Sequence, residues 1–239
     1  MARPQGRSPE ALRSIQIEPG FSNQAASVLF RLEKTVVNCT ALIEPKLPNF
    51  AEPGSGWISA EYAMLPASTQ QRIQREKKGK SHDRGTEIQR MIGRSLRGAV
   101  NLRKMGEIAL YIDCDVLSAD GGTRCASISG AYLAVVLALR RLEKEGKVKV
   151  ADVIKHEIAA VSVGFVKGQL RLDLEFVEDS KAEVDLNLVM TGDKRIIEIQ
   201  GTGEYATFGI HQTVEMINLG YKGIEEILKA GREFLAKVS

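Results

Sequence analysis

The spacing of apolar and polar residues changes several times along the chain. Segments 25–31, 34–43 and 57–63 are rich in β-branched and aromatic residues and are separated by prolines and glycines, a pattern typical of strands. From Thr86 to Ala99 the apolar residues follow helical spacing, and Thr86 with Gln89 matches a capping box at a helix start. This part of the chain therefore predicts strands followed by an amphipathic helix.

The rest of the chain repeats this order of strands before helices. Residues 108–116 alternate as in a strand and end in a glycine-containing loop, after which a long apolar helix extends to about residue 143. The next segments predict an antiparallel meander of four strands, at 158–166, 170–176, 184–190 and 195–200. Two helical patterns follow, at 209–219 and 223–237. We expect an α+β fold, a single domain over residues 1–239, and two pseudo-repeated, strand-rich halves with helices.

Composition adds that the chain can fold into a core of its own. It has 239 residues, of which 44% are hydrophobic and 26% charged. No apolar run approaches the ~20 residues of a membrane span, and the first residues lack a signal-peptide pattern, so we expect a cytoplasmic protein with no membrane contact. The three cysteines have no Cys-x-x-Cys spacing, which argues against structural zinc.

Charge is concentrated in one part of the sequence. The net charge is +3, but residues 72–104 hold eleven Lys or Arg against three acidic residues, so the remainder of the chain is net negative. Within this run Arg90, Arg94 and Arg97 form a cationic stripe on the predicted helix. The run predicts a polyanionic partner, and a solvated helix face next to a loop is the alternative.

Two features are candidate phosphate ligands. In the loop 120–124 two glycines let the backbone approach an anion, so Gly122, Thr123, Arg124 and the start of the following helix are predicted to converge on phosphate. Arg84, at the start of the basic helix, is the second candidate. A glycine turn and two ordinary surface arginines remain the alternative.

A third feature is the acidic set Glu178, Asp179, Asp185 and Asn187. Asp185 and Asn187 share one face of a predicted strand, and oxygen ligands of this kind suit Mg²⁺ or Mn²⁺. The alternative is that Glu178 and Asp179 are turn residues. The three features together are what phosphorolysis of RNA needs, because inorganic phosphate must approach an anionic phosphodiester in line while its charge is neutralised.

Seven blocks of sequence, in order from Arg3 almost to the C-terminus, resemble the ribonuclease PH family. They are Arg3–Arg7, GWISAEYAMLP, EIQRMIGRSLR, IDCDVLSADGGTR, AAVSVG, EDSKAEVDLNLVM and EIQGTGE. The resemblance implies that Arg84, Thr123 and Arg124 bind phosphate and that Asp179 and Asp185 are metal-associated catalytic carboxylates. It also implies an RNA-contacting region formed by Arg72, Arg75, Lys77, Lys78 and Lys80.

The family resemblance further implies a fold similar to domain 2 of ribosomal protein S5, and usually a hexameric ring of identical subunits. The implied activity is phosphate-dependent 3′-to-5′ trimming of tRNA precursors and other RNA 3′ ends, with release of nucleoside diphosphates. A non-catalytic RNA-binding subunit related to the exosome core is the alternative. A small-molecule phosphotransferase is a weaker one, since the Gly-x-x-x-x-Gly-Lys-Ser/Thr loop is absent.

Four positions depart from the usual family pattern. Gln5, Glu33, Asn101 and Ile108 stand where Asp, Gly, Asp and Arg are usual. None of them is a predicted catalytic residue. We expect their effects to be on local packing, on the turn before Lys34 and on substrate preference.

Overall fold

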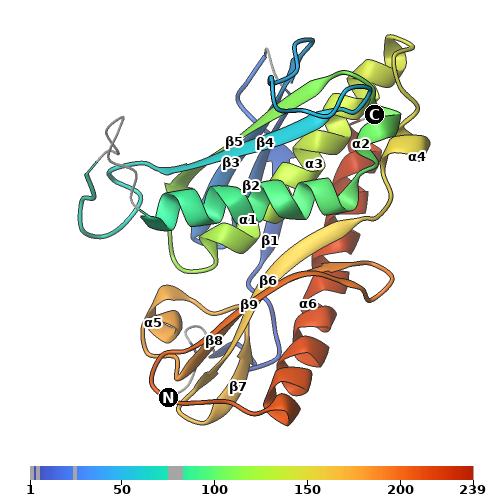
Figure 1. Cartoon of the computed structure of the whole chain (residues 1–239). Helices are drawn as coiled ribbons and strands as arrows, with labels where there is room; N and C mark the ends of the chain where they lie inside the picture. Colours follow the sequence, from blue (N-terminus) through green and yellow to red (C-terminus); the bar gives the residue numbers. More distant parts are fainter. Residues whose placement is uncertain (1–2, 4–5, 24–25, 75–82, 239) are drawn as a thin grey trace.

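The computed structural model describes residues 3, 6–23, 26–74 and 83–238, and it contains two sheets with helices between and beside them (Figure 1). The first sheet has the order β1-β2-β3-β5-β4. Its strands are β1 Ile15–Pro19, which the sequence pattern did not predict, β2 Ala26–Leu32, β3 Thr35–Glu44, β4 Trp57–Met64 and β5 Ala109–Ser118. Strands β4 and β5 are parallel because the helices α1 (Asp83–Ala99) and α2 (Leu102–Met105) cross over between them.

The second sheet is antiparallel, with the order β7-β6-β8-β9. Its strands are β6 Ile158–Val166, β7 Gln169–Leu172, β8 Val184–Thr191 and β9 Ile196–Gly203. The predicted meander is therefore wrong in its order, because β8 pairs with β6 and not with β7. The chain leaves the sheet after β7 at Asp173, which has a left-handed φ of 54° and a carboxylate bonded to Arg13, and then forms α5 (Phe176–Asp179).

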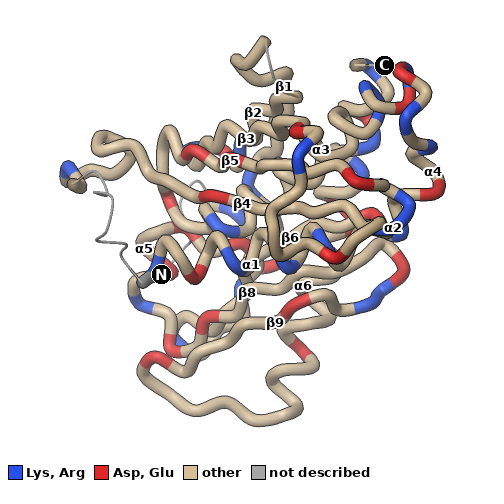
Figure 2. The backbone as a smooth tube through the Cα atoms, turned by 45° about the horizontal axis from the view of Figure 1, so that its top comes forward, with Lys and Arg blue, Asp and Glu red and all other residues tan. Residues whose placement is uncertain are grey.

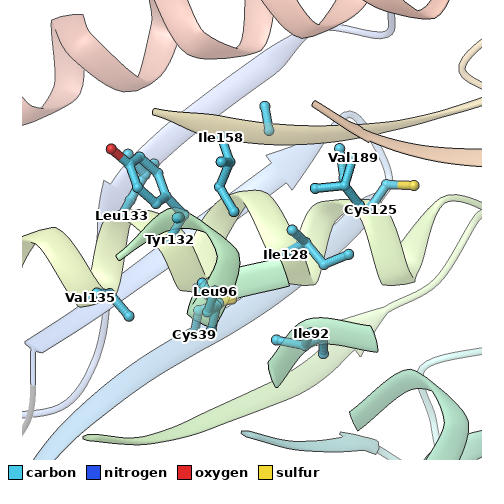
Figure 3. Packing of buried hydrophobic residues seen from close by; sticks show 14 of the residues in the cluster. Cys39, Ile92, Leu96, Cys125, Ile128, Tyr132, Leu133, Val135, Ile158 and Val189 are labelled. Carbon is cyan, nitrogen blue, oxygen red and sulfur yellow. The ribbon is translucent and has the colours of Figure 1, made fainter. Parts of the chain in front are cut away.

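Helix α3 (Thr123–Lys144) lies between the two sheets and packs against β2 and β3 of the first and β6 of the second (Figure 1). In Figure 3 its Ile128 lies between Val189 of β8 and Ile92 of α1, and the same hydrophobic cluster includes residues of both halves. By length and composition α3 would also fit a membrane span, but 83% of its most apolar window is buried inside the protein. The buried core helices of many proteins have the same length and apolar composition, so these two properties of α3 are only weak evidence for a membrane span.

Two of the predicted helix boundaries are wrong. Helix α1 begins at Asp83, so Thr86 lies within the helix and does not cap it. The two predicted C-terminal helices form one, α6 (Ile210–Lys237), which runs straight through Gly220 and Gly223. A Cβ atom at Gly220 would lie 2.7 Å from Leu188, so this glycine lets the helix approach the sheet closely rather than ending it.

The structure accounts for three of the four family departures. Glu33 forms the turn between β2 and β3 with a φ of 54°, a conformation that costs a non-glycine residue about 1 kcal/mol. Asn101 caps α2, because its side chain accepts a hydrogen bond from the Lys104 amide. Ile108 is partly buried against the core cluster. The fourth, Gln5, lies outside the described residues.

Candidate active site

An open pocket of about 450 Å³ lies where the two halves meet, beside the starts of α1 and α3. These helix starts and α5 lie on the same side of the molecule (Figure 1). The pocket brings together four of the residues predicted from sequence, Arg84, Arg124, Asp179 and Asp185. The described residues that line it are Arg84, Glu87, Arg124, Asp179, Ser180, Asp185, Glu204 and Tyr205. Gly122 and Thr123 adjoin Arg124 in sequence but are not part of this lining.

The loop before α3 has a backbone shape that requires glycine. Gly121 and Gly122 have φ values of 77° and 69°, and a Cβ atom at Gly121 would lie 2.5 Å from the Leu174 carbonyl oxygen. Arg13 donates hydrogen bonds to the carbonyls of Asp120 and Gly121, at 2.7 and 3.3 Å. The loop is thus held in one conformation, and the first turn of α3 leaves N–H groups without intrahelical partners, as anion binding requires.

Each predicted phosphate-binding side chain on α3 contacts a side chain from another element. The Thr123 hydroxyl lies 2.9 Å from the phenolic oxygen of Tyr62 on β4, and both side chains are buried. Arg124 donates a hydrogen bond of 2.8 Å to the side-chain oxygen of Gln200 on β9. The amide nitrogen of Gln200 in turn contacts Glu87 of α1, so one side chain joins α3 to α1 across the pocket.

The two predicted catalytic carboxylates share an environment that disfavours their charge. Burial, and then the nearby Asp179, raise the pKa of Asp185 to about 6, against the attraction of Arg124. Burial also raises the pKa of Asp179, although Arg124 and Arg84 oppose this shift. Oδ2 of Asp185 accepts a 3.2 Å hydrogen bond from Asn187, whose own oxygen accepts one from the Cys125 thiol. A chain of side chains from the core therefore orients Asp185.

Glu178, the remaining member of the acidic set, belongs to a different structure. It is buried and forms ion pairs with Arg3 and Arg171, at 2.9 and 2.7 Å. Burial alone would raise the pKa of Glu178, but its hydrogen bonds with these two arginines lower it. Its place in the metal-binding set is therefore corrected: Glu178 fixes the four-residue helix α5, which presents the adjacent Asp179 to the pocket.

The donor set in the pocket fits a divalent cation bound together with substrate. Oδ1 of Asp185 is buried and has no hydrogen-bond partner among the described residues. Among the described residues, the lining has four carboxylates and two guanidinium groups, and one divalent cation would balance the charge of these six side chains. No group of three His, Cys, Asp or Glu in the described part of the chain is arranged to hold a metal alone. Mg²⁺ commonly uses one or two carboxylates and takes its other ligands from water and substrate phosphates.

The predicted RNA-contacting region is only partly described. Arg72 is exposed, whereas Arg75, Lys77, Lys78 and Lys80 lie outside the described residues. Of the predicted cationic stripe on α1, Arg90 is exposed and Arg94 is half exposed and paired with Glu198. Arg97 packs over the ring of Trp57 and donates a hydrogen bond to a backbone carbonyl. Basic and acidic positions are interspersed over the described backbone (Figure 2).

Sequence reasoning missed several residues around this pocket. Glu87 lies one turn after Arg84 on the same helix, and that spacing could have identified it. Gln200 and Glu204 fall in the EIQGTGE block, which served only to support the resemblance. No sequence signal connects Tyr62 with Thr123, because 61 residues separate them.

Comparison with known proteins decides the family. Sequence models of the 3′ exoribonuclease family match residues 11–140 as its domain 1 and residues 156–223 as its domain 2. The chain is 47% identical to ribonuclease PH of Syntrophomonas wolfei over 238 residues, covering 98% of this chain and 99% of the relative. It is also 47% identical to ribonuclease PH of Corynebacterium kroppenstedtii, covering 98% of this chain and 93% of the relative.

The chain belongs to the ribonuclease PH family of 3′ exoribonucleases. Solved structures support the ribonuclease PH fold at lower sequence identity. Rice (Oryza sativa) Rrp46 has a TM-score of 0.78 at 17% identity, covering 96% of this chain and 98% of that protein. An archaeal exosome core has a TM-score of 0.77 at 19% identity, covering 96% and 91%. The α+β fold expected from the ribonuclease PH resemblance is thus confirmed.

Proposed function

We propose that this protein is a phosphate-dependent exoribonuclease that trims tRNA precursors and other RNA 3′ ends in the 3′-to-5′ direction, in the cytoplasm, releasing nucleoside diphosphates. One observation carries the proposal: a single pocket holds two arginines at helix starts and two carboxylates of raised pKa. The chain around it matches ribonucleases PH from end to end.

The reaction needs alignment and charge neutralisation more than a strong base. Inorganic phosphate binds at the α3 start, where Arg124 and the first-turn N–H groups attract it, and Arg84 adds charge from the opposite helix. A phosphate oxygen attacks the scissile phosphorus in line, the bond to the 3′ oxygen breaks, and that oxygen takes up a proton. The products are a nucleoside diphosphate and an RNA shorter by one nucleotide.

Asp179 and Asp185 are the residues that would hold Mg²⁺, or Mn²⁺, at the scissile phosphate. The cation would neutralise charge on the phosphodiester and help to orient it. Asn187 fixes the position of Asp185, and Glu178 fixes α5 and with it Asp179. We propose that the RNA body contacts Arg72, Arg75, Lys77, Lys78 and Lys80, and that the protein works as a hexameric ring of identical subunits.

End-labelled RNA incubated with Mg²⁺, with and without inorganic phosphate, tests the proposal. Trimming should require phosphate and yield nucleoside diphosphates. Arg124→Ala should cut turnover and raise the KM for phosphate, because it removes a charge-assisted contact to the nucleophile. Arg232→Ala, a change in an exposed ion pair far from the pocket lining, is the control and should act as wild type. Nucleoside monophosphate products would rule the proposal out. RNA binding without any trimming would favour the non-catalytic exosome-like subunit.

A further inference from the structure

One aromatic ring stands in a pocket wall that is otherwise charged or hydroxylic. Tyr205 lines the pocket together with arginines, carboxylates and Ser180, and among the described residues of that lining it is the only aromatic one. Its side chain is strongly exposed, with 77% of the residue accessible to solvent. A flat apolar surface is therefore available beside the groups proposed to act on phosphates.

The backbone that carries this ring is anchored on both sides. The Tyr205 amide donates a 3.2 Å hydrogen bond to the Glu183 carbonyl, which ties it to the residue before β8. A Cβ atom at Gly203 would lie 2.2 Å from the Ala206 carbonyl oxygen, so only glycine permits this tight turn. Phe208 then packs against the core cluster. The backbone at Tyr205 is thus held in place beside the pocket that its side chain lines.

We propose that Tyr205 is the binding platform for the nucleobase of the RNA 3′-terminal nucleotide, which stacks on its ring. This inference rests on the proposed function and adds a subsite to it. The charged wall takes the phosphates, and the terminal base needs an apolar face next to them. Stacking on an aromatic ring accepts every base, because each has a π-face, and this suits an enzyme that removes nucleotides in succession.

The stacking role makes specific demands on the side chain. The ring is required and the hydroxyl is not, so Tyr205→Phe and Tyr205→Trp should retain RNA affinity, while Tyr205→Ala should raise the KM for RNA about ten-fold. The KM for inorganic phosphate should stay unchanged, because Arg124 and the α3 start bind it. Phe21, a phenylalanine on the β1–β2 loop with 71% exposure, lies outside the pocket lining and provides a matched control in Phe21→Ala.

The decisive comparison uses two short RNAs that differ only in whether the 3′-terminal nucleotide carries a base. Binding is followed by fluorescence anisotropy without phosphate, and turnover by release of nucleoside diphosphate. We expect Tyr205→Ala to bind the intact RNA about ten-fold more weakly than wild type, and both proteins to bind the abasic RNA equally. An equal loss on both RNAs, or no loss on either, would overturn the inference.

Failure of this inference can be told apart from failure of the proposed function. If wild type releases nucleoside diphosphates and Tyr205→Ala does so with an unchanged KM for RNA, only the stacking role is wrong. If wild type releases none, the proposed function fails, and the anisotropy comparison still decides whether the ring recognises a terminal base.

Discussion

Three side chains predicted to act on substrate are each oriented by a partner that contributes no charge of its own. Tyr62 contacts Thr123, Gln200 contacts Arg124, and Asn187 contacts Asp185. Partners of this kind restrict the rotamers of the functional groups before substrate arrives, and they reduce the entropy lost in the bound state. Their removal should change specific kinetic constants and leave the fold intact.

Tyr62→Phe tests the first of these contacts. If the Thr123 hydroxyl donates its proton to phosphate, it must accept from Tyr62, so loss of the phenol should raise the KM for phosphate roughly three- to ten-fold. The change in kcat should be small, because the ring still fills its place in the core. Phosphate titration of the wild type and of Tyr62→Phe measures the effect, and the same titration in a Thr123→Val background is the control. If Tyr62→Phe raised the KM for phosphate just as much in the Thr123→Val background, Tyr62 would not act through Thr123.

Asp185→Asn should inactivate the enzyme and yet stabilise the metal-free protein at neutral pH. The folded-state pKa of Asp185 is raised to about 6, so its ionised form is disfavoured by folding. The stability that goes with protonation is fully present below the unfolded pKa of 3.8 and is lost as the pH rises through about 6. The free energy of unfolding of the variant should therefore exceed that of wild type by on the order of 2 kcal/mol at pH 8 and by little below pH 4. Urea unfolding without divalent cations at both pH values measures this, and an equal gain at both would refute the explanation.

At the level of secondary-structure elements, the glycine-containing loop before α3 depends on the N-terminal segment of the chain. Arg13 reaches the carbonyls of Asp120 and Gly121 while it is paired with Asp173 at 2.5 Å, and both charged side chains are buried. Thr35 bonds to the same loop through its hydroxyl. The conformation of Gly121 and Gly122 is thus set in part by Arg13 and Thr35, which lie more than 80 positions away.

Asp173→Asn should destabilise the protein by about 3–5 kcal/mol, because it leaves the buried Arg13 without its counter-charge. Burial alone would raise the pKa of Asp173, but the hydrogen bond and charge of Arg13 lower it. The stabilisation is therefore present above the unfolded pKa of 3.8 and is lost as the pH falls through the lower folded value. Chemical unfolding at pH 7 and pH 3 measures the difference in unfolding free energy between wild type and Asp173→Asn, and this difference should be smaller at pH 3.

Asp193→Asn is the matched control for that experiment. Asp193 also pairs with an arginine, Arg195 at 2.9 Å, but both side chains are largely exposed. Solvent screens such a pair, so its loss should leave unfolding almost unchanged. Similar losses in the two variants would show that the buried position of Asp173 has no special importance.

For the whole molecule, α3 lies within one core shared by both sheets, and the pocket opens beside its first turn. A single pocket of about 450 Å³ has no room for a folded tRNA body. A closed ring would place basic residues from neighbouring subunits near each pocket and raise their effective concentration. The proposed hexamer therefore has a physical advantage for structured substrates.

Light scattering at micromolar concentration should give six times the chain mass of 26.2 kDa. Affinity for tRNA should fall steeply with salt, because several phosphates are contacted at once. Reversing the charge of Arg72, Arg75 and Lys77 should weaken binding and flatten that salt dependence. A monodisperse monomer that trims tRNA as efficiently as any larger species would contradict the ring.

The sequence by itself determined most helical and strand periodicities and the glycine loop before α3, because these signals are local and need only spacing and residue type. Residue types alone predicted an acidic set of Glu178, Asp179, Asp185 and Asn187, and the family resemblance singled out Asp179 and Asp185. It also determined the family, since many ordered blocks match. Only the tertiary structure decided that Glu178 anchors α5, that α6 is one helix and that β8 pairs with β6. The same holds for Tyr62, Gln200 and Tyr205, which meet the site across long sequence separations. Packing between elements, which leaves no local pattern in the sequence, sets such contacts.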